Sequence, residues 1–239
     1  MFKDFLLARH APDKSLTEVQ TYLEYVHAPL ALSVTALAQE LQRYTMNHVV
    51  SDDRARCALH AGLPGLATVV EHVLGGWPGI SRFSVDPDYL AHVKPDEQHM
   101  ETTLLHGPPP FVAVEQELPI FHSEGTGALR IFDFIRAATN LTHADFLTAL
   151  DQDGQAWARS APYQTAVTRR VHSIVGGGVA SFGAETDPID AVIEVWVHDY
   201  DVFGRLRDDQ LARRAAFYNI DRSFSAVTIQ RTLKMESNI

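Results

Sequence analysis

Residues 22–30 read YLEYVHAPL and form the second part of an expected amphipathic helix. Apolar residues recur at every third or fourth position, the period of a helix with one buried face, at Leu16, Val19, Leu23, Val26 and Leu30. Ser15 and Glu18 have the spacing of a capping box, so the helix is expected to begin at Ser15. Pro29 lacks an amide hydrogen and crowds the carbonyl group of Tyr25, so we expect the helix to bend or stop near His27.

Composition and charge describe an ordinary globular protein. The chain has 239 residues, of which 46% are hydrophobic and 21% charged. Its net charge of −10 disfavours a nucleic-acid partner. A single cysteine, Cys57, excludes a disulfide framework within the chain and a thiolate metal cluster. Residues 1–11 are too polar for a signal peptide or a membrane span, so we expect a cytoplasmic protein without membrane partners.

Residues 1–121 alternate between expected strands and helices. Strands are expected at residues 2–8, 43–50, 67–74 and 111–118, where β-branched and aromatic residues are concentrated. Besides the opening helix, we expect a helical piece at residues 35–42 and two short helices within residues 75–100. The order strand, helix, strand, strand, helix, strand is that of the ferredoxin-like fold.

The same order recurs after a polar stretch at residues 122–127, which we interpret as a linker. Strands are expected at residues 129–137, 166–175, 190–198 and 225–233, and helices at residues 140–159 and 200–218. Glu71 and Glu194 fall at matching positions, because 194 − 71 = 123, and so do His48 and His172, because 172 − 48 = 124. We therefore expect two repeats, residues 1–121 and residues 128–239.

Each repeat would leave one apolar sheet face open, and the other repeat can cover it. The expected fold is α+β, with two ferredoxin-like βαββαβ repeats whose antiparallel sheets pack as a barrel within one chain, leaving room inside for a small ligand. Closure across a dimer is the alternative, and a homodimer built through exposed strand edges is a further option.

Several motifs carry a family resemblance. His27-Ala28-Pro29-Leu30 is followed by Arg43-Tyr44 and Asn47-His48, and then by Glu71, the pair Asp96-Glu97 and Val112-Ala113-Val114-Glu115. In this order they resemble the EthD family of the dimeric α+β barrel superfamily. Residues 189–196 and 220–223 are similar to the corresponding elements in the second half. Residues 151–156 read DQDGQA where a second His-Ala-Pro-Leu would stand, which indicates one site per chain, with the second half as a lid and a wall.

The resemblance implies a small cofactor-free enzyme that acts on an aromatic, polyketide or lactone compound by cyclisation, dehydration or isomerisation. Imidazole titrates near neutral pH, so His27 suits a general base that removes a proton next to a carbonyl group. Tyr44, Asn47 or His48 would donate a hydrogen bond to the developing oxyanion. A purely structural His27, which ties the helix end to a strand, is the alternative.

Three further residues are candidates for contact with a small hydrophobic carbonyl or aromatic substrate. They are Tyr22, Glu71 and Trp196. Each also has a structural interpretation: Tyr22 lies beside the apolar face of its helix, Glu71 recurs as Glu194, and Trp196 suits a core position.

Two other functions stay open from the sequence. One is a non-catalytic binding or accessory protein of a degradation pathway, which a purely apolar enclosure around His27 would favour. A weaker one is haem binding, since tandem barrels of the chlorite dismutase kind bind haem through a histidine of the second half. Here His172 and His198 are the candidates that lie within expected strands of that half. The sequence contains no close pair of zinc ligands and no Gly-x-Ser-x-Gly motif. We therefore expect neither a metal nor another cofactor.

Overall fold

The computed structural model describes residues 2–76, 82–125, 127, 129–175 and 189–235. Residue 126 of the expected linker and residue 128, the expected start of the second repeat, lie outside the described part. Its strands are β1 (Phe2–Arg9), β2 (Leu41–Val49), β3 (Leu66–Leu74), β4 (Phe111–His122), β5 (Leu129–Ile135), β6 (Val167–Val175), β7 (Ala191–Val197) and β8 (Phe224–Met235). All pair antiparallel and close a barrel in the order β1-β3-β2-β8-β5-β7-β6-β4. Each half has its own ferredoxin-like sheet, β4-β1-β3-β2 and β8-β5-β7-β6. The predicted fold class is confirmed, and the barrel closes within one chain.

Two strands of 12 residues join the halves, β4 and β8. β4 pairs with β1 at residues 111–114 and with β6 at residues 114–122. β8 pairs in the same way with β5 at residues 224–228 and with β2 at residues 228–235. β4 runs past its expected end at Leu118 because its second part belongs to the other half.

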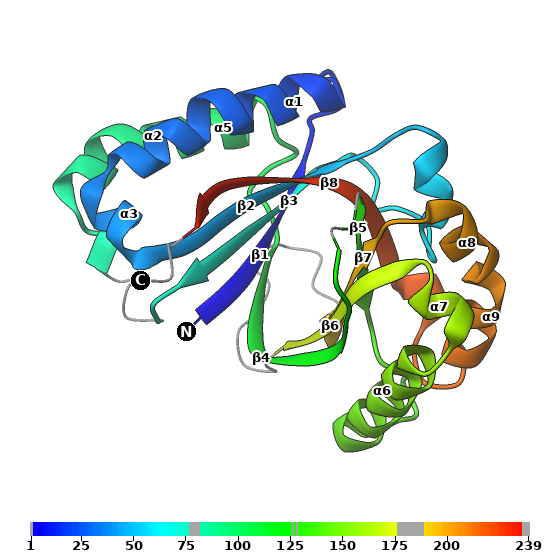
Figure 1. The fold of residues 1–239 in the computed structure, drawn as a ribbon. Helices are drawn as coiled ribbons and strands as arrows, with labels where there is room; N and C mark the ends of the chain where they lie inside the picture. The colour runs from blue at the N-terminus through cyan, green and yellow to red at the C-terminus, as the bar shows by residue number, and fades with distance from the viewer. Residues whose placement is uncertain (1, 77–81, 126, 128, 176–188, 236–239) are drawn as a thin grey trace.

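Helices cover the outer face of each sheet. The first half has α1 (Leu16–Tyr22), η1 (Leu23–His27), α2 (Ala28–Ser33), α3 (Thr35–Glu40), η2 (Asp53–Cys57), η3 (Tyr89–Val93) and α5 (Lys94–Thr103). The second half has α6 (His143–Ala158), α7 (Ala161–Gln164), α8 (Tyr200–Arg205), α9 (Arg207–Arg214) and η4 (Ile220–Arg222). Figure 1 shows α1, α2 and α5 over the sheet of β1, β2 and β3, and α6 to α9 along the second half. No helix among the described residues has the length and apolarity to cross a membrane.

The opening helix begins as predicted, and near His27, where a bend or a stop was expected, it changes to a π turn and does not stop. Ser15 caps α1 in a capping box with Glu18. The chain then makes one π turn, η1, in which the amide of Ala28 binds the carbonyl of Leu23, and continues as α2. The π turn shifts the backbone hydrogen bonds by one residue, so Pro29 stands at the start of α2, where no amide donor is needed.

The second helix of this half also contains a π turn directly before a proline. The π turn η3 ends at Val93, and Pro95 stands at the start of α5. The amide of Lys94 binds the carbonyl of Tyr89, as Ala28 binds Leu23 in the first helix. Both helices therefore run on through a proline over the same sheet.

Side chains fill the barrel interior. Phenylalanine rings pack against one another there, with 5.6 Å between the centroids of Phe5 and Phe132 and 4.6 Å between those of Phe134 and Phe224. The first three of these rings are completely buried. The described inward-facing positions thus carry large aromatic and charged residues where room for a ligand was expected.

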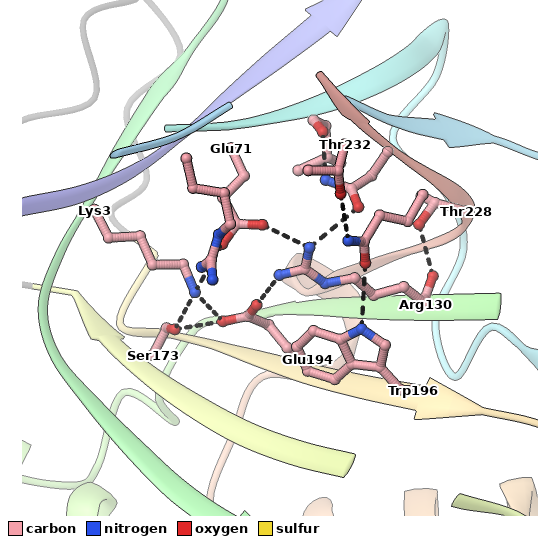
Figure 2. A network of polar contacts seen from close by, with 12 residues as sticks. Lys3, Glu71, Arg130, Ser173, Glu194, Trp196, Thr228 and Thr232 are labelled. Atoms are coloured by element: carbon pink, nitrogen blue, oxygen red, sulfur yellow. Dashed lines mark hydrogen bonds and ion pairs between the residues drawn. The ribbon is translucent and has the colours of Figure 1, made fainter. Parts of the chain in front are cut away.

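Four buried charges lie in the same interior, and we call them the interior cluster: Lys3, Glu71, Arg130 and Glu194. Lys3 Nζ lies 2.8 Å from Glu194 Oε1 and 3.4 Å from Glu71 Oε1. Arg130 Nη1 lies 2.6 Å from Glu71 Oε2, and its Nη2 donates to Glu194. Each cation thus binds one carboxylate from each half (Figure 2). Burial alone would raise the pKa of Glu194, but Lys3 and Arg130 hold it below its ordinary value.

The strand pairing shows which residues of the two halves correspond. Phe5 lies opposite Glu71, and Phe132 lies opposite Glu194. The predicted match of Glu71 with Glu194 is therefore confirmed. The two glutamates of the interior cluster occupy equivalent positions in the two halves.

The predicted match of His48 with His172 is wrong. Met46 pairs with Val70, and His172 pairs with Ile193. Val70 and Ile193 are separated by 193 − 70 = 123 positions, as the two glutamates are, so His172 corresponds to Met46. Counting residues failed because the second and third strands of each half are joined by connections of different length: Met46 precedes Glu71 by 71 − 46 = 25 positions, and His172 precedes Glu194 by 194 − 172 = 22.

We expect the variant Lys3→Met to lower the free energy of unfolding by about 3–5 kcal/mol, because it leaves two buried carboxylates with fewer cations. Urea unfolding of this variant and of the control Lys14→Met, a lysine beside Asp13 in a surface turn, measures the difference. A loss below about 1 kcal/mol for Lys3→Met would contradict the importance of the interior cluster.

Candidate functional site

A cavity of about 490 Å³ lies outside the barrel, between the helices of the first half and the outer face of their sheet. Its walls are mostly apolar, with Leu23, Ala31 and Val93 from the helices and Leu6 and Val70 from the strands. All the described residues that line it fall between Asp4 and Phe111. No described residue of the second half therefore lines this cavity, for which a lid and a wall from that half were expected.

His27 faces this cavity from the end of the π turn η1. Its Nδ1 lies 2.8 Å from Asp96 Oδ2 on α5, and the two side chains are 14% and 11% exposed. Tyr22 donates to the other oxygen of Asp96. The hydrogen bonds from His27 and Tyr22 hold the pKa of Asp96 below its ordinary value, although burial opposes them. An ionised Asp96 places the proton of His27 on Nδ1, so Nε2, which no described group binds, can accept a proton.

His72 faces the cavity from the sheet side, and its ring is held in a similar way. Its Nδ1 lies 2.9 Å from Asp4 Oδ1 on the neighbouring strand β1. Tyr44 is the pairing partner of His72 on β2, and their ring centroids are 4.9 Å apart. No described group binds Nε2 of His72. The sheet side of the cavity therefore carries a second imidazole oriented by a carboxylate.

Tyr44 is a neutral hydrogen-bond donor in this cavity. Burial raises the pKa of its hydroxyl, and the nearby carboxylates of Glu97, Asp4 and Asp96 raise it further. Among the described residues, none binds this hydroxyl. It therefore stays protonated near neutral pH and can donate to a ligand oxygen.

Glu97 is a further polar group on the helix side. It accepts from the Tyr89 hydroxyl at 2.8 Å and from Lys94 Nζ at 3.0 Å. Burial raises the pKa of Tyr89, and the charge of Glu97 adds to this effect. The charge of Lys94 at the cavity wall is thereby compensated by the carboxylate of Glu97.

The structure brings only part of the predicted site together. His27 and Tyr44 share the cavity, and Tyr22 lies behind His27, where it binds Asp96. His48 lies on the same outer face of the sheet but in a separate polar cavity of about 390 Å³. Its Nε2 lies 2.9 Å from Glu24, and its Nδ1 lies 3.0 Å from Thr68. Burial lowers the pKa of His48, and Glu24 opposes this shift.

The other three predicted residues lie inside the barrel. Asn47 donates to the carbonyl of Val69 at 2.9 Å and accepts from Arg130. Glu71 belongs to the interior cluster. Trp196 contacts Arg130, whose guanidinium carbon lies 4.4 Å from a ring centroid of the indole. The sheet therefore separates these residues from His27.

Sequence reasoning missed His72 and Asp4. Alternation along residues 67–74 places His72 on the face opposite Glu71, but it does not show which strand lies beside it. The pairing of Tyr44 with His72 and of Asp4 with His72 depends on the register of three strands. Asp96 was noticed only as part of the family pattern, without a role.

The corresponding space in the second half is filled by buried polar groups. Asp153 Oδ2 lies 3.1 Å from Arg170 Nη2 and 3.2 Å from Arg214 Nε. His172 Nε2 accepts from Arg170 Nε at 2.8 Å, and burial lowers the pKa of His172, as do both arginines. A Cβ added to Gly154 would lie 2.6 Å from His172 Cε1.

These residues do not fit a haem. The Nε2 of His172 is occupied by an arginine, and the main chain of Gly154 closes the space beside the ring. His198 lies beyond the end of β7 and is exposed, so it is not the strand residue that was expected. Across the described residues, no group of three His, Cys, Asp or Glu side chains is arranged to hold a metal ion.

Comparisons with known proteins agree with the fold. Residues 11–101 match the EthD domain, which confirms the resemblance for the first half. No curated protein matches the chain by sequence. A protein of Fusobacterium nucleatum described as a candidate monooxygenase aligns over 99% of this chain and 94% of its own, with a TM-score of 0.53 and 8% identity.

Two further solved structures belong to the chlorite dismutase kind. A candidate chlorite dismutase aligns over 96% of this chain and 94% of its own, with a TM-score of 0.54 and 7% identity. The chlorite dismutase of Candidatus Nitrospira defluvii, in complex with imidazole, aligns over 95% and 90%, with a TM-score of 0.53 and 9% identity. At this identity the likeness establishes the fold, and the function has to be argued from the residues of this chain.

We expect Tyr22→Phe to lower the free energy of unfolding by about 1.5 kcal/mol at pH 6, because it removes a hydrogen bond to an ionised carboxylate. The pKa of Asp96 is lower in the folded than in the unfolded chain, so this difference is full above about pH 5 and shrinks as the pH falls through the folded pKa. Urea unfolding from pH 3 to pH 7 measures it, with Tyr25→Phe, a 69% exposed tyrosine, as the control. A difference that does not change with pH would contradict the ionised Asp96.

Proposed function

We propose that the cavity of the EthD domain is the active site of an enzyme that acts by general acid/base catalysis on a small aromatic, polyketide or lactone compound. His27 is the general base, Asp96 orients it, and Tyr44 donates a hydrogen bond to the substrate oxygen. The observation that carries this proposal is the presence of a carboxylate-bound imidazole and a protonated phenol on one apolar cavity of about 490 Å³.

The residues suit the removal of a proton next to a carbonyl group. His27 takes this proton on Nε2, and the resulting imidazolium is stabilised by the carboxylate of Asp96 at Nδ1. The electron pair of the C–H bond moves to the carbonyl oxygen, which becomes an enolate and accepts a hydrogen bond from Tyr44. Cyclisation, dehydration and isomerisation can all begin with this step. No described side chain has to supply electrons for it.

A non-catalytic binding protein for a small molecule is the other candidate. The largely apolar cavity wall would suit a carrier of a small molecule as well as an enzyme. The polar groups around His27 favour catalysis, because a carrier for an apolar compound needs no imidazole with a free nitrogen held by a buried carboxylate. Cytoplasmic location and a homodimer remain part of this proposal as expectations from the sequence.

The variant His27→Asn tests the general base. The amide of asparagine can keep the bond that Nδ1 makes to Asp96, but it has no basic nitrogen in the cavity. With 1-tetralone, an uncharged bicyclic aromatic ketone, in D₂O, we expect the variant to slow exchange of the α-proton that faces His27 by at least about 10²-fold. The exchange is followed by NMR, and the melting temperature is measured in parallel.

The control is His92→Asn, which changes an exposed histidine in the other π turn. It should leave the exchange rate at the wild-type value. Equal exchange by His27→Asn and the wild type would contradict the assignment of the base. Binding of 1-tetralone without any exchange by the wild type would favour the carrier.

A further inference from the structure

We propose that His72, oriented by Asp4, is a second acid/base group of the same site, so that a proton is taken from one face of the substrate and returned to the opposite face. This inference rests on the proposed function and adds a residue, a stereochemical course and a substrate class to it. It concerns an uncharged ketone or lactone that carries a hydrogen on a stereogenic or prochiral carbon next to the carbonyl group.

The rings of the two histidines are oriented in the same way, each by a carboxylate at Nδ1. Nδ1 of His72 lies 2.9 Å from Asp4, as Nδ1 of His27 lies 2.8 Å from Asp96. His72 is 19% exposed and Asp4 only 3%, so the carboxylate is shielded while the ring reaches the cavity. In both rings Nε2 has no partner among the described residues. His48, which lies outside this cavity, instead uses both of its nitrogens, with Glu24 and Thr68.

The histidines reach the cavity from opposite walls. His27 belongs to the helix layer, whereas His72 belongs to β3 in the sheet beneath it. A flat substrate that fills the space between helices and sheet therefore has one imidazole on each face. Tyr44 lies beside His72 on the sheet side, and its hydroxyl is free for the carbonyl oxygen. Because Tyr44 binds the carbonyl oxygen, His72 can exchange a proton with the carbon atom next to the carbonyl group.

The charges around the cavity favour an uncharged substrate. Asp4, Glu97 and Glu101 line it, and Lys94, the cation among the lining residues apart from the histidines, is bound to Glu97. Asp96 adds a further negative charge behind His27. Carboxylates at this density would repel an anionic substrate but stabilise a positive charge on either imidazole.

The step balances without a redox partner. His27 takes the hydrogen as a proton on Nε2, and the C–H electron pair forms an enolate whose oxygen Tyr44 binds. Protonated His72 then delivers the proton of its Nε2 to the opposite face of the carbon, and the enolate electron pair forms the new C–H bond. His27 has gained one proton and His72 has lost one, and exchange with solvent restores both.

The test uses the separate enantiomers of 2-methyl-1-tetralone in D₂O, with chiral chromatography and mass spectrometry as the readout. The wild type should exchange the α-hydrogen of both enantiomers and racemise them. His72→Asn, which can keep the bond to Asp4, should slow exchange of one enantiomer at least tenfold and leave exchange of the other. His27→Asn should do the reverse, and neither variant should racemise. His92→Asn should behave as the wild type.

The outcomes separate the two proposals. Exchange with retained configuration by the wild type, or unchanged exchange of both enantiomers by His72→Asn, would overturn the second base while His27 stands. Exchange by the wild type no faster than by a His27→Asn, His72→Asn double variant would overturn both proposals.

A second variant covers the case in which His72→Asn does not fold. Asp4→Asn keeps the imidazole but removes the charge that orients it. It should slow exchange of the same enantiomer that depends on His72, and shift the pH profile for that enantiomer only. An equal effect on both enantiomers would indicate a structural role and overturn the assignment.

Discussion

The interior cluster is the contact on which the architecture depends, because Lys3 and Arg130 each bind a carboxylate from both halves. Buried charges of this kind are stable only when all of them are paired, so the two sheets have to meet in one register. The cluster and the neighbouring phenylalanine rings then leave the barrel interior to side chains. The apolar cavity that the described residues form lies instead outside the barrel, between a sheet and its helices.

The two halves differ in what fills the space between the sheet and its helices. In the first half, small and aliphatic residues of α2 and η1 leave the cavity that His27 faces. In the second half, α6 carries Asp153 and Gly154 in the stretch where a His-Ala-Pro-Leu would stand. Asp153 binds Arg170 and Arg214, and Gly154 packs against His172. The departure from the repeat thus places packed, polar side chains where the first half has its cavity.

Local signals in the sequence predicted local structure well. The capping box at Ser15, the alternating strands and the correspondence of Glu71 with Glu194 all appear in the structure. Of the expected bend or stop near His27, the stop does not occur, because a π turn that ends at His27 absorbs Pro29 and the helix continues. The candidate site was only partly predictable, since the meeting of Tyr44, His72 and Asp4 depends on strand register, which the residues of one strand do not determine.

The orientation of the two imidazoles is the claim on which the functional account depends. Nitrogen-15 NMR of histidine-labelled protein, assigned with His27→Asn and His72→Asn, reports which ring nitrogen carries the hydrogen when the imidazole is neutral. The account predicts that both rings carry it on Nδ1, facing Asp96 and Asp4, with a bare Nε2 toward the cavity. A hydrogen on Nε2 of either ring would contradict the role given to that histidine.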